Sequence, residues 1–302
     1  MSTSPGRAPR PDFLKVRLRV GPNFTNVRGV ISDLGLHTVC QEARCPNIYE
    51  CWQDRAATFL ILGSVCTRNC AYCAVQSGRP APADLDEPRR VAEAVAAFGL
   101  EYVVVTSVTR DDLADGGAAI FAATIRAIRA RVPGCRVEVL VPDFAGNMAA
   151  VDLVMAARPD VFNHNIETVS RLFRVARPKG SYERSLEVLS HAAQWRESGT
   201  AGDGAGIVPV KSGFMVGLGE SEEEIIQVLR DLRQAGVASV TIGQYLQPTR
   251  RHLPVAKYYT PAEFDRLREL ARGMGFAHVE AGPLVRSSYH ARRQFYSTAG
   301  GA

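Results

Sequence analysis

The stretch ATFLILGSVCTRNCAYC, residues 57–73, joins a continuous apolar run at residues 58–63 to a loop that holds three cysteines. An apolar run of this length, bounded by glycine, is typical of a strand that is buried on both faces. Five similar runs follow: residues 102–106, 136–141, 161–165, 210–217 and 239–243. Segments with helical periodicity alternate with them: residues 88–98, 117–131, 146–157, 182–197, 221–235 and 261–273.

Six strand–helix units in succession predict an α/β fold with parallel strands joined by right-handed crossovers. Six units are too few for a closed eight-stranded barrel, so we expect a partial (β/α)6 TIM-type barrel over residues 58–275. Residues 21–57 then form an N-terminal extension that carries three cysteines, and residues 276–302 form a C-terminal extension. Chemistry in such folds gathers at the C-terminal ends of the strands, where the cysteine loop of residues 64–73 is expected to lie.

Composition and charge point to an ordinary globular protein with one unusual segment. Hydrophobic residues make up 46% and charged residues 22% of the 302 residues. No apolar run approaches the roughly 18 residues that span a bilayer, and the first dozen residues lack the apolar core of an export signal. We therefore expect a cytoplasmic protein with no membrane partner.

Residues 1–20 carry five cations against one acidic residue. They predict a flexible basic arm that either only keeps the chain soluble or binds an acidic protein or a nucleic acid. Residues 199–209, GTAGDGAGIVP, predict a flexible surface insertion.

Six of the seven cysteines fall within residues 40–73. In a chain without an export signal, such clustering favours a metal site or catalysis over disulfides. The loop cysteines Cys66, Cys70 and Cys73 have the spacing CxxxCxxC. A structural zinc ion takes four protein ligands, one more than this loop offers. A cubane iron–sulfur cluster has four irons, so three thiolates leave one iron open to a cofactor or substrate.

A second triad, Cys40-x4-Cys45-x5-Cys51, precedes the first predicted strand. Three thiolates can again hold an iron–sulfur cluster, and zinc is the alternative for both triads. Cys135 stands alone before a predicted strand and is expected to be a buried, neutral thiol. Four histidines show no ligand spacing, and we assign them no role: His37, His191, His252 and His278.

The CxxxCxxC loop, with Tyr72 before its last cysteine, resembles the radical S-adenosylmethionine superfamily. In that superfamily the open iron of a [4Fe–4S] cluster binds S-adenosylmethionine, and one electron releases a 5′-deoxyadenosyl radical. The segments EARCPNIYECW (residues 42–52) and ATFLILGSVCTRNCAYC together resemble the lipoyl synthase family, in which CxxxxCxxxxxC marks an auxiliary [4Fe–4S] cluster. The sequence RSSYHA, residues 286–291, is similar to a third motif of that family.

The resemblance extends from about Leu34 to Ala291 and implies a set of cluster ligands. The first triad, Cys66, Cys70 and Cys73, would hold the cluster that binds S-adenosylmethionine. The second triad would hold the auxiliary cluster, which is the sulfur donor, with a serine oxygen as fourth ligand. We favour Ser288 over Ser287 for that role; alternatively, the two hydroxyls only shape a turn. An alkoxide is a poorer match than a thiolate for the soft cluster, so it can leave when the cluster is dismantled.

The resemblance also implies a reaction and its partners. Two S-adenosylmethionine molecules are used to insert sulfur at C6 and C8 of an octanoyl chain, amide-linked to a lysine of a lipoyl carrier domain. These methylene groups have no acidic proton for a general base, which is why a radical is needed. The expected carriers are the acyltransferase subunits of 2-oxo acid dehydrogenases and the glycine-cleavage H protein. An electron donor such as flavodoxin or ferredoxin and a cluster-assembly protein are further expected partners; a nucleic acid is not.

Polar residues at the predicted strand ends are candidates for binding S-adenosylmethionine. The Glu167 carboxylate can accept hydrogen bonds from both ribose hydroxyls, with Asn165 beside it. Arg177, or alternatively Lys179, can pair with the methionine carboxylate. Asn and Glu that follow a strand also often cap the next helix, which is the structural alternative for Asn165 and Glu167. The candidate set is Tyr72, Thr106, Ser107, Asn165, Glu167 and Arg177.

Two other classes of protein fit part of this pattern. A radical enzyme that acts on tRNA, such as a methylthiotransferase, also uses two clusters. Such enzymes carry an added nucleic-acid-binding module, and no segment of this sequence resembles one. An electron-transfer or metal-binding protein would need neither an open iron nor a barrel of this size.

Overall fold

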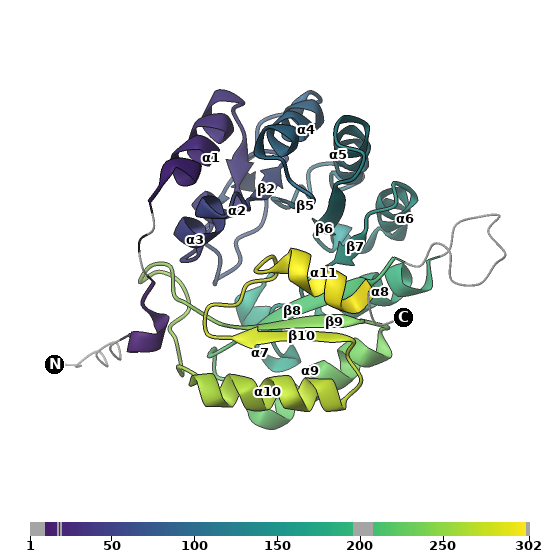
Figure 1. The fold of residues 1–302 in the computed structure, drawn as a ribbon. Coiled ribbons are helices and arrows are strands. Elements are labelled where there is room, and N and C mark those ends of the chain that lie inside the picture. Colours follow the sequence, from purple (N-terminus) through teal and green to yellow (C-terminus); the bar gives the residue numbers. More distant parts are fainter. Residues whose placement is uncertain (1–9, 17, 19, 196–207, 300–302) are drawn as a thin grey trace.

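A computed structural model describes residues 10–16, 18, 20–195 and 208–299, and its main element is a curved sheet (Figure 1). Within these residues, seven strands run parallel in this order: β2 (Thr58–Ile61), β5 (Tyr102–Ser107), β6 (Arg136–Leu140), β7 (Val161–Asn163), β8 (Val210–Val216), β9 (Ser239–Gln244) and β10 (His278–Gly282). The short strand β1 (His37–Thr38) pairs antiparallel with β2. The basic arm and the insertion predicted from the sequence lie largely outside the described residues.

Helices that connect successive parallel strands cover the convex face of the sheet (Figure 1). They are α4 (Glu87–Phe98), α5 (Ala118–Arg131), α6 (Met148–Ala156), α8 (Tyr182–Gln194), α9 (Glu222–Gln234) and α10 (Pro261–Gly273). The main hydrophobic core lies between these helices and the sheet. Capping boxes start α9 at Ser221 and α10 at Thr260. This alternation confirms the predicted α/β fold of the partial-barrel type.

Several elements lie where the sequence pattern did not predict them. Three helices precede the barrel: α1 (Pro22–Asp33), α2 (Val39–Glu42) and α3 (Ile48–Gln53). α1 does carry a helical signal, because Phe24, Val27 and Ile31 recur at intervals of three and four. β10 lies within the predicted C-terminal extension; it has only five residues, two of them partly exposed, so it lacks a continuous apolar run. The short helix α7 (Ser170–Ala176) follows β7.

The helix α11 (Ala291–Ala299) crosses the concave side of the sheet, where Figure 1 shows it in yellow. It contacts β5 and β10. Ala291 and Phe295 pack against Tyr102 and Val104 of β5, and the rings of Phe295 and Tyr102 are 5.8 Å apart. The helix therefore fills part of the barrel interior and joins two strands that lie far apart in the sheet order.

A buried polar cluster lies beside α11 in the barrel interior. The Glu138 carboxylate accepts hydrogen bonds from Tyr102 at 2.6 Å and Asn163 at 2.9 Å, and pairs with Lys211 at 3.0 Å. These four residues come from the adjacent strands β5 to β8, so the cluster ties four strands together at the inner surface of the sheet.

Candidate active site

A cavity of about 1120 Å³ opens at the C-terminal ends of the strands. The strand ends reach it at Ser107 of β5, Leu140 of β6, Met215 of β8 and Gln244 of β9. Cys135 is buried and is not among the lining residues. The structure brings both predicted triads into this cavity: Cys40, Cys45, Cys51, Cys66, Cys70 and Cys73.

The first triad lies in and after the short strand β3 (Val65–Cys66), which pairs with β4 (Gln76–Ser77). The Cys66 Sγ accepts hydrogen bonds from the backbone N–H groups of Arg68 and Thr109, both at 3.4 Å. Hydrogen bonds of this kind hold a ligand sulfur in place and tune the potential of an iron–sulfur cluster. Burial raises the pKa of Cys73 to about 12 and also raises the pKa of Cys70. Metal binding to these thiols therefore releases protons.

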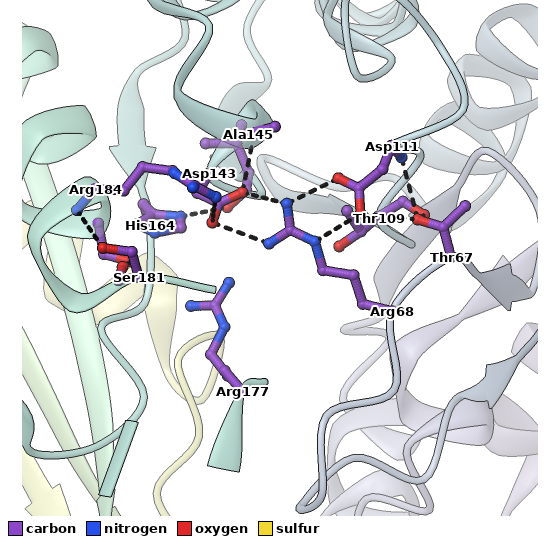
Figure 2. Close-up of polar contacts among 12 residues, drawn as sticks. Thr67, Arg68, Thr109, Asp111, Asp143, Ala145, His164, Arg177, Ser181 and Arg184 are labelled. Atoms are coloured by element: carbon purple, nitrogen blue, oxygen red, sulfur yellow. Dashed lines mark hydrogen bonds and ion pairs between the residues drawn. The ribbon is translucent and has the colours of Figure 1, made fainter. Parts of the chain in front are cut away.

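Arg68, within the same loop, is the centre of a network of ion pairs (Figure 2). Its guanidinium donates to both oxygens of Asp143, at 2.6 and 2.9 Å, and to both oxygens of Asp111, at 2.8 and 2.9 Å. The side chains of Arg68 and Asp143 are 3% and 0% exposed. Burial alone raises the pKa of Asp143, but the hydrogen bonds and charge of Arg68 outweigh it and hold the pKa at about 2. The network ties the cysteine loop to the segments that follow β5 and β6.

The loop that follows β9 contacts the same cysteine loop from its other side. The Nε2 of His252 lies 2.9 Å from the carbonyl oxygen of Cys73, and its Nδ1 lies 2.8 Å from Thr249 Oγ1. The Leu253 N–H donates to the Ala71 carbonyl at 3.0 Å. His252 was assigned no role from the sequence because it shows no ligand spacing, and spacing does not reveal a contact with a backbone carbonyl.

The second triad is carried by the two short helices before the barrel. Cys40 lies in α2, Cys51 lies in α3, and Cys45 lies between these helices. Burial and the neighbouring Cys45 raise the pKa of Cys40 to about 11. Burial also raises the pKa of Cys45, and burial together with the two other thiols raises that of Cys51. The three sulfur atoms are therefore close enough to influence one another.

A buried indole donor provides a test of whether this triad suits an iron–sulfur cluster. Trp52 is 1% exposed, and its Nε1 has no hydrogen-bond partner within normal distance. The indole faces Cys40, where it opposes the rise in the thiol pKa, as does the backbone N–H of Thr58. A buried donor without a good acceptor is costly, and a thiolate bound to a cluster at Cys40 is a stronger acceptor than the neutral thiol that the indole now faces. The donor set therefore fits a cluster.

Among the described residues, no three His, Cys, Asp or Glu side chains converge on the position of one metal ion. A cubane does not require such convergence, because each of its thiolate ligands binds a different iron.

The C-terminal segment, residues 283–290, docks on the helix that carries Cys51. The Asn47 Nδ2 donates to the carbonyl of Leu284 at 2.7 Å. The Tyr289 hydroxyl donates to Glu50 Oε1 at 3.1 Å. Both contacts flank the second triad, so the segment passes directly beside it.

The two serines of this segment face different partners. The Ser288 Oγ accepts a hydrogen bond from the Thr58 hydroxyl at 2.8 Å, and the backbone N–H of Thr58 faces Cys40. The Ser287 hydroxyl donates to Asn165 Oδ1 at 2.8 Å. The geometry thus puts Ser288 on the side of the second triad and Ser287 on the side of the strand ends.

Glu167 follows β7 with a left-handed backbone, φ 70°, which a β-bridge to Phe214 holds in place. Non-glycine residues in this conformation carry strain and cluster at functional sites. Burial raises the pKa of the Glu167 carboxyl, and the charge of Arg177 and hydrogen bonds from Asn165 and Tyr72 offset part of the rise. These four predicted residues therefore lie together, and all four line the cavity.

Three further polar residues at the strand ends differ in what their atoms do. The Thr106 hydroxyl donates to the Leu140 carbonyl at 2.8 Å, so its proton is used within the sheet. The Ser107 Oγ is buried without a hydrogen-bond partner and lines the cavity. His164 is 1% exposed and hydrogen-bonds the Val141 carbonyl through Nδ1, which leaves Nε2 without a partner. Unpaired buried polar atoms on a cavity wall fit the binding of a polar ligand such as S-adenosylmethionine.

Sequence reasoning missed the residues that hold the first triad in place. Arg68 lies inside the CxxxCxxC motif, and Asp143 directly follows an apolar strand in the sequence VLVPD. The sequence shows both residues as candidates for a polar contact, because one is charged and lies between the cysteines and the other is acidic and follows a strand. The sequence does not show that the two residues pair with each other, because they are 75 residues apart. No sequence signal links Thr58 with Ser288, which are 230 residues apart.

Comparisons with known proteins agree with this fold. The model of the Radical SAM superfamily matches residues 60–232, more than half of the chain, and that of the N-terminal domain of lipoyl synthase matches residues 3–45. A lipoyl synthase of Rubrobacter xylanophilus is 59% identical over 289 residues, 96% of this chain and 87% of the relative. That of Symbiobacterium thermophilum is 57% identical over 285 residues, 94% and 86% of the two chains. Streptococcus suis SuiB bound to S-adenosylmethionine shares the fold, with a TM-score of 0.52 and 11% identity over 82% of this chain and 52% of that one.

A partial barrel with a three-cysteine loop after its first parallel strand defines the class, that of radical SAM proteins. Within this class, the chain belongs to the lipoyl synthase family. It is accordingly an enzyme, a sulfurtransferase of the radical SAM type that uses [4Fe–4S] clusters and S-adenosylmethionine and acts on octanoylated lipoyl domains. The family inferred from the three motifs is confirmed. None of the described helices combines the length and apolar character needed to cross a membrane.

Proposed function

We propose that the two cysteine triads divide the work of sulfur insertion. The first triad, Cys66, Cys70 and Cys73, holds the [4Fe–4S] cluster that binds S-adenosylmethionine. The second triad and Ser288 hold the auxiliary cluster, whose sulfide is consumed as a substrate. The observation that carries this proposal is the shared cavity, because an octanoyl chain bound there is within reach of both triads. When bound, the first cluster and S-adenosylmethionine supply the hydrogen abstraction that acid–base chemistry cannot perform on a methylene group.

The strand-end residues bind and orient S-adenosylmethionine. Glu167 and Asn165 face the ribose hydroxyls, and the Arg177 guanidinium pairs with the methionine carboxylate. Arg177 suits this role because it is 7% exposed and its Nε has no hydrogen-bond partner. Tyr72 lies beside the adenine. The free hydroxyl of Ser107 offers a further polar contact, whereas Thr106 acts mainly by fixing the end of β5.

The remaining wall of the cavity excludes water from the alkyl chain. It includes Leu60, Val104, Leu140 and Met215, which come from four different strands. An eight-carbon chain gains roughly 0.8 kcal/mol for each methylene group that it buries. The same apolar wall keeps water away from reactive species.

The carrier domain stays outside the cavity, and only its acylated lysine enters. The carriers are the acyltransferase subunits of 2-oxo acid dehydrogenases and the glycine-cleavage H protein, met in the cytoplasm. Flavodoxin or ferredoxin supplies electrons, and an assembly protein renews the auxiliary cluster. The basic arm contributes to docking an acidic carrier, which is supported by Arg10 and Val16 lining the cavity. Deletion of residues 1–20 tests this role: unchanged activity and unchanged salt dependence would remove the arm from the account.

Alanine variants of the two triads test the division of labour. We expect anaerobically reconstituted enzyme to hold about eight irons per chain, four for each cubane. Cys40→Ala, Cys45→Ala or Cys51→Ala should keep reductive cleavage of S-adenosylmethionine but abolish sulfur transfer to an octanoylated carrier. Cys70→Ala should abolish both, and Cys135→Ala, the matched control, neither. Loss of cleavage with retained transfer in a Cys40 variant would reverse the assignment.

The same preparations separate the two other classes of function. A zinc protein would contain no sulfide, and an electron carrier would not cleave S-adenosylmethionine. Modification of tRNA in place of an octanoylated carrier would indicate a methylthiotransferase.

A further inference from the structure

The adjacent residues Ser287 and Ser288 point the C-terminal segment at two different sites. Ser288 contacts Thr58 on the side of the second triad, at 2.8 Å. Ser287 contacts Asn165, also at 2.8 Å, across 122 residues of sequence. Only the first of these contacts is explained by an auxiliary-cluster ligand, so the second needs its own account.

The contact with Ser287 determines which way the Asn165 side chain faces. A side-chain amide has one acceptor oxygen and one donor nitrogen, which are exchanged when the amide flips. Because Asn165 Oδ1 accepts a hydrogen bond from the Ser287 hydroxyl, its amide nitrogen is turned toward Glu167, where it donates a hydrogen bond to the carboxylate. The flipped amide would place an oxygen against the carboxylate and repel it.

Glu167 has few other restraints on its side chain. Its backbone is fixed, because its N–H donates to the Gly213 carbonyl at 3.0 Å and its carbonyl accepts from the Met215 N–H at 2.8 Å. Beyond the charge of Arg177, the groups that face its carboxylate are Asn165 and Tyr72. The orientation of Asn165 is therefore a large part of what sets the position of the carboxylate.

The barrel leaves room for this contact at a glycine of β8. A Cβ added to Gly213 would lie 3.0 Å from Asn165 Oδ1, 3.1 Å from Ser287 Oγ and 2.3 Å from Thr241 Oγ1. Any side chain there would push apart the two groups that form the hydrogen bond. The backbone of β8 is thus compatible with the contact only as glycine.

We infer that Ser287 is a positioning residue for the carboxylate of Glu167, so that the C-terminal segment completes the S-adenosylmethionine site as well as the auxiliary-cluster site. The inference rests on the proposed roles of Asn165 and Glu167 in binding the ribose. Ser287 touches neither cofactor in this account; it acts through the amide of Asn165. The two neighbouring hydroxyls thereby have separate effects that substitution can resolve.

Equilibrium binding of S-adenosylmethionine to the reconstituted enzyme, without reductant, tests the inference independently of turnover. Ser287→Ala should weaken binding about tenfold, the effect of losing one well-placed hydrogen bond of about 1.4 kcal/mol. Ser287→Thr keeps the hydroxyl and should restore affinity to within about twofold. The exposed Ser32→Ala, in α1, is the matched control.

The second measurement is the Mössbauer spectrum of the auxiliary cluster in the same variants. Ser288→Ala should change the iron that carries the oxygen ligand and leave affinity for S-adenosylmethionine within about threefold of the parent. Ser287→Ala should do the reverse. Unchanged affinity in Ser287→Ala together with weakened binding in Glu167→Gln would overturn the inference alone. Unchanged affinity in Glu167→Gln would instead overturn the proposed ribose role.

Discussion

The two cysteine triads share a cavity but differ in what holds them. The loop of the first triad is fixed by Arg68, whose two carboxylate partners follow neighbouring barrel strands. The side chain of His252 and the backbone N–H of Leu253, from the loop after β9, contact its carbonyl groups. The second triad lies on two short helices and is closed by the C-terminal segment through Asn47, Thr58 and Glu50. Charged and buried contacts hold one site, and hydrogen bonds between side chains and a tail close the other.

This difference suits the two chemical roles. A cluster that binds a cofactor in every turnover needs constant geometry, which charge-assisted hydrogen bonds to segments at the ends of two rigid strands provide. A cluster that gives up its sulfur must be dismantled and rebuilt. A closing segment held by a few single hydrogen bonds, two between neutral groups worth about 1 kcal/mol each and one from Tyr289 to the Glu50 carboxylate, can open at modest cost.

The largest expected effect comes from removing the charge at the centre of the first loop. Arg68→Met leaves the Asp143 carboxylate buried, with Arg184 at 3.6 Å and the charge of Arg177 as remaining counter-charges but without the two direct hydrogen bonds from Arg68. We expect the free energy of unfolding to fall by roughly 3 kcal/mol, as is typical when one partner of a buried ion pair is lost. Anaerobic denaturant unfolding of the reconstituted enzyme measures it. Arg89→Met, which removes an arginine that is 58% exposed, should cost less than about 1 kcal/mol. Equal losses in both variants would contradict the comparison.

A smaller effect is expected at the closing segment. Asn47 is 3% exposed, and Asn47→Ala leaves the Leu284 carbonyl unpaired, at a cost of about 1–2 kcal/mol. Because the contact is local, hydrogen exchange should rise in residues 283–290 and stay unchanged in β8 and β9. Asn26→Ala, at an exposed position of α1, serves as control. Exchange that rises equally throughout the barrel would show that the segment is not a separately held unit.

The smallest expected effect is a dependence of the free energy of unfolding on pH, which comes from a buried histidine on the barrel side of the cavity. Burial lowers the pKa of His164 from 6.5 to about 4. The unfolded chain therefore binds a proton that the folded chain does not between these values, and stability falls as the pH drops through this window. Between pH 7.5 and 5.5 this residue should account for about 1 kcal/mol of lost stability. His164→Gln should remove that part of the slope in unfolding experiments. An unchanged slope would assign the dependence to other groups.

The barrel could be predicted from the sequence because its information is local. Strands such as β5 and β8 are continuous apolar runs, and the helices between them begin at recognisable caps. β10 was missed as a strand because it has only five residues and buried residues alternate with partly exposed ones in its first half, so it shows no continuous apolar run. α1 was missed although its apolar residues recur with helical spacing.

The candidate site could be predicted where candidate ligands follow one another at fixed spacing, and not where partners come from distant parts of the chain. The CxxxCxxC spacing alone identifies Cys66 and Cys70 as candidate ligands. Asp143 pairs with Arg68, and Thr58 pairs with Ser288, only after the fold has brought their segments together. Glu167 was found because polar residues at strand ends meet at one edge of a parallel sheet, which is a rule of topology.

The position of α11 also has a consequence for synthesis of the protein. A ribosome makes the barrel strands first and residues 286–299 later, so a growing chain can fold its sheet and still lack Ser287 and Ser288. Until α11 has packed on β5 and β10, the nascent protein has the first triad but not the segment that finishes the cavity.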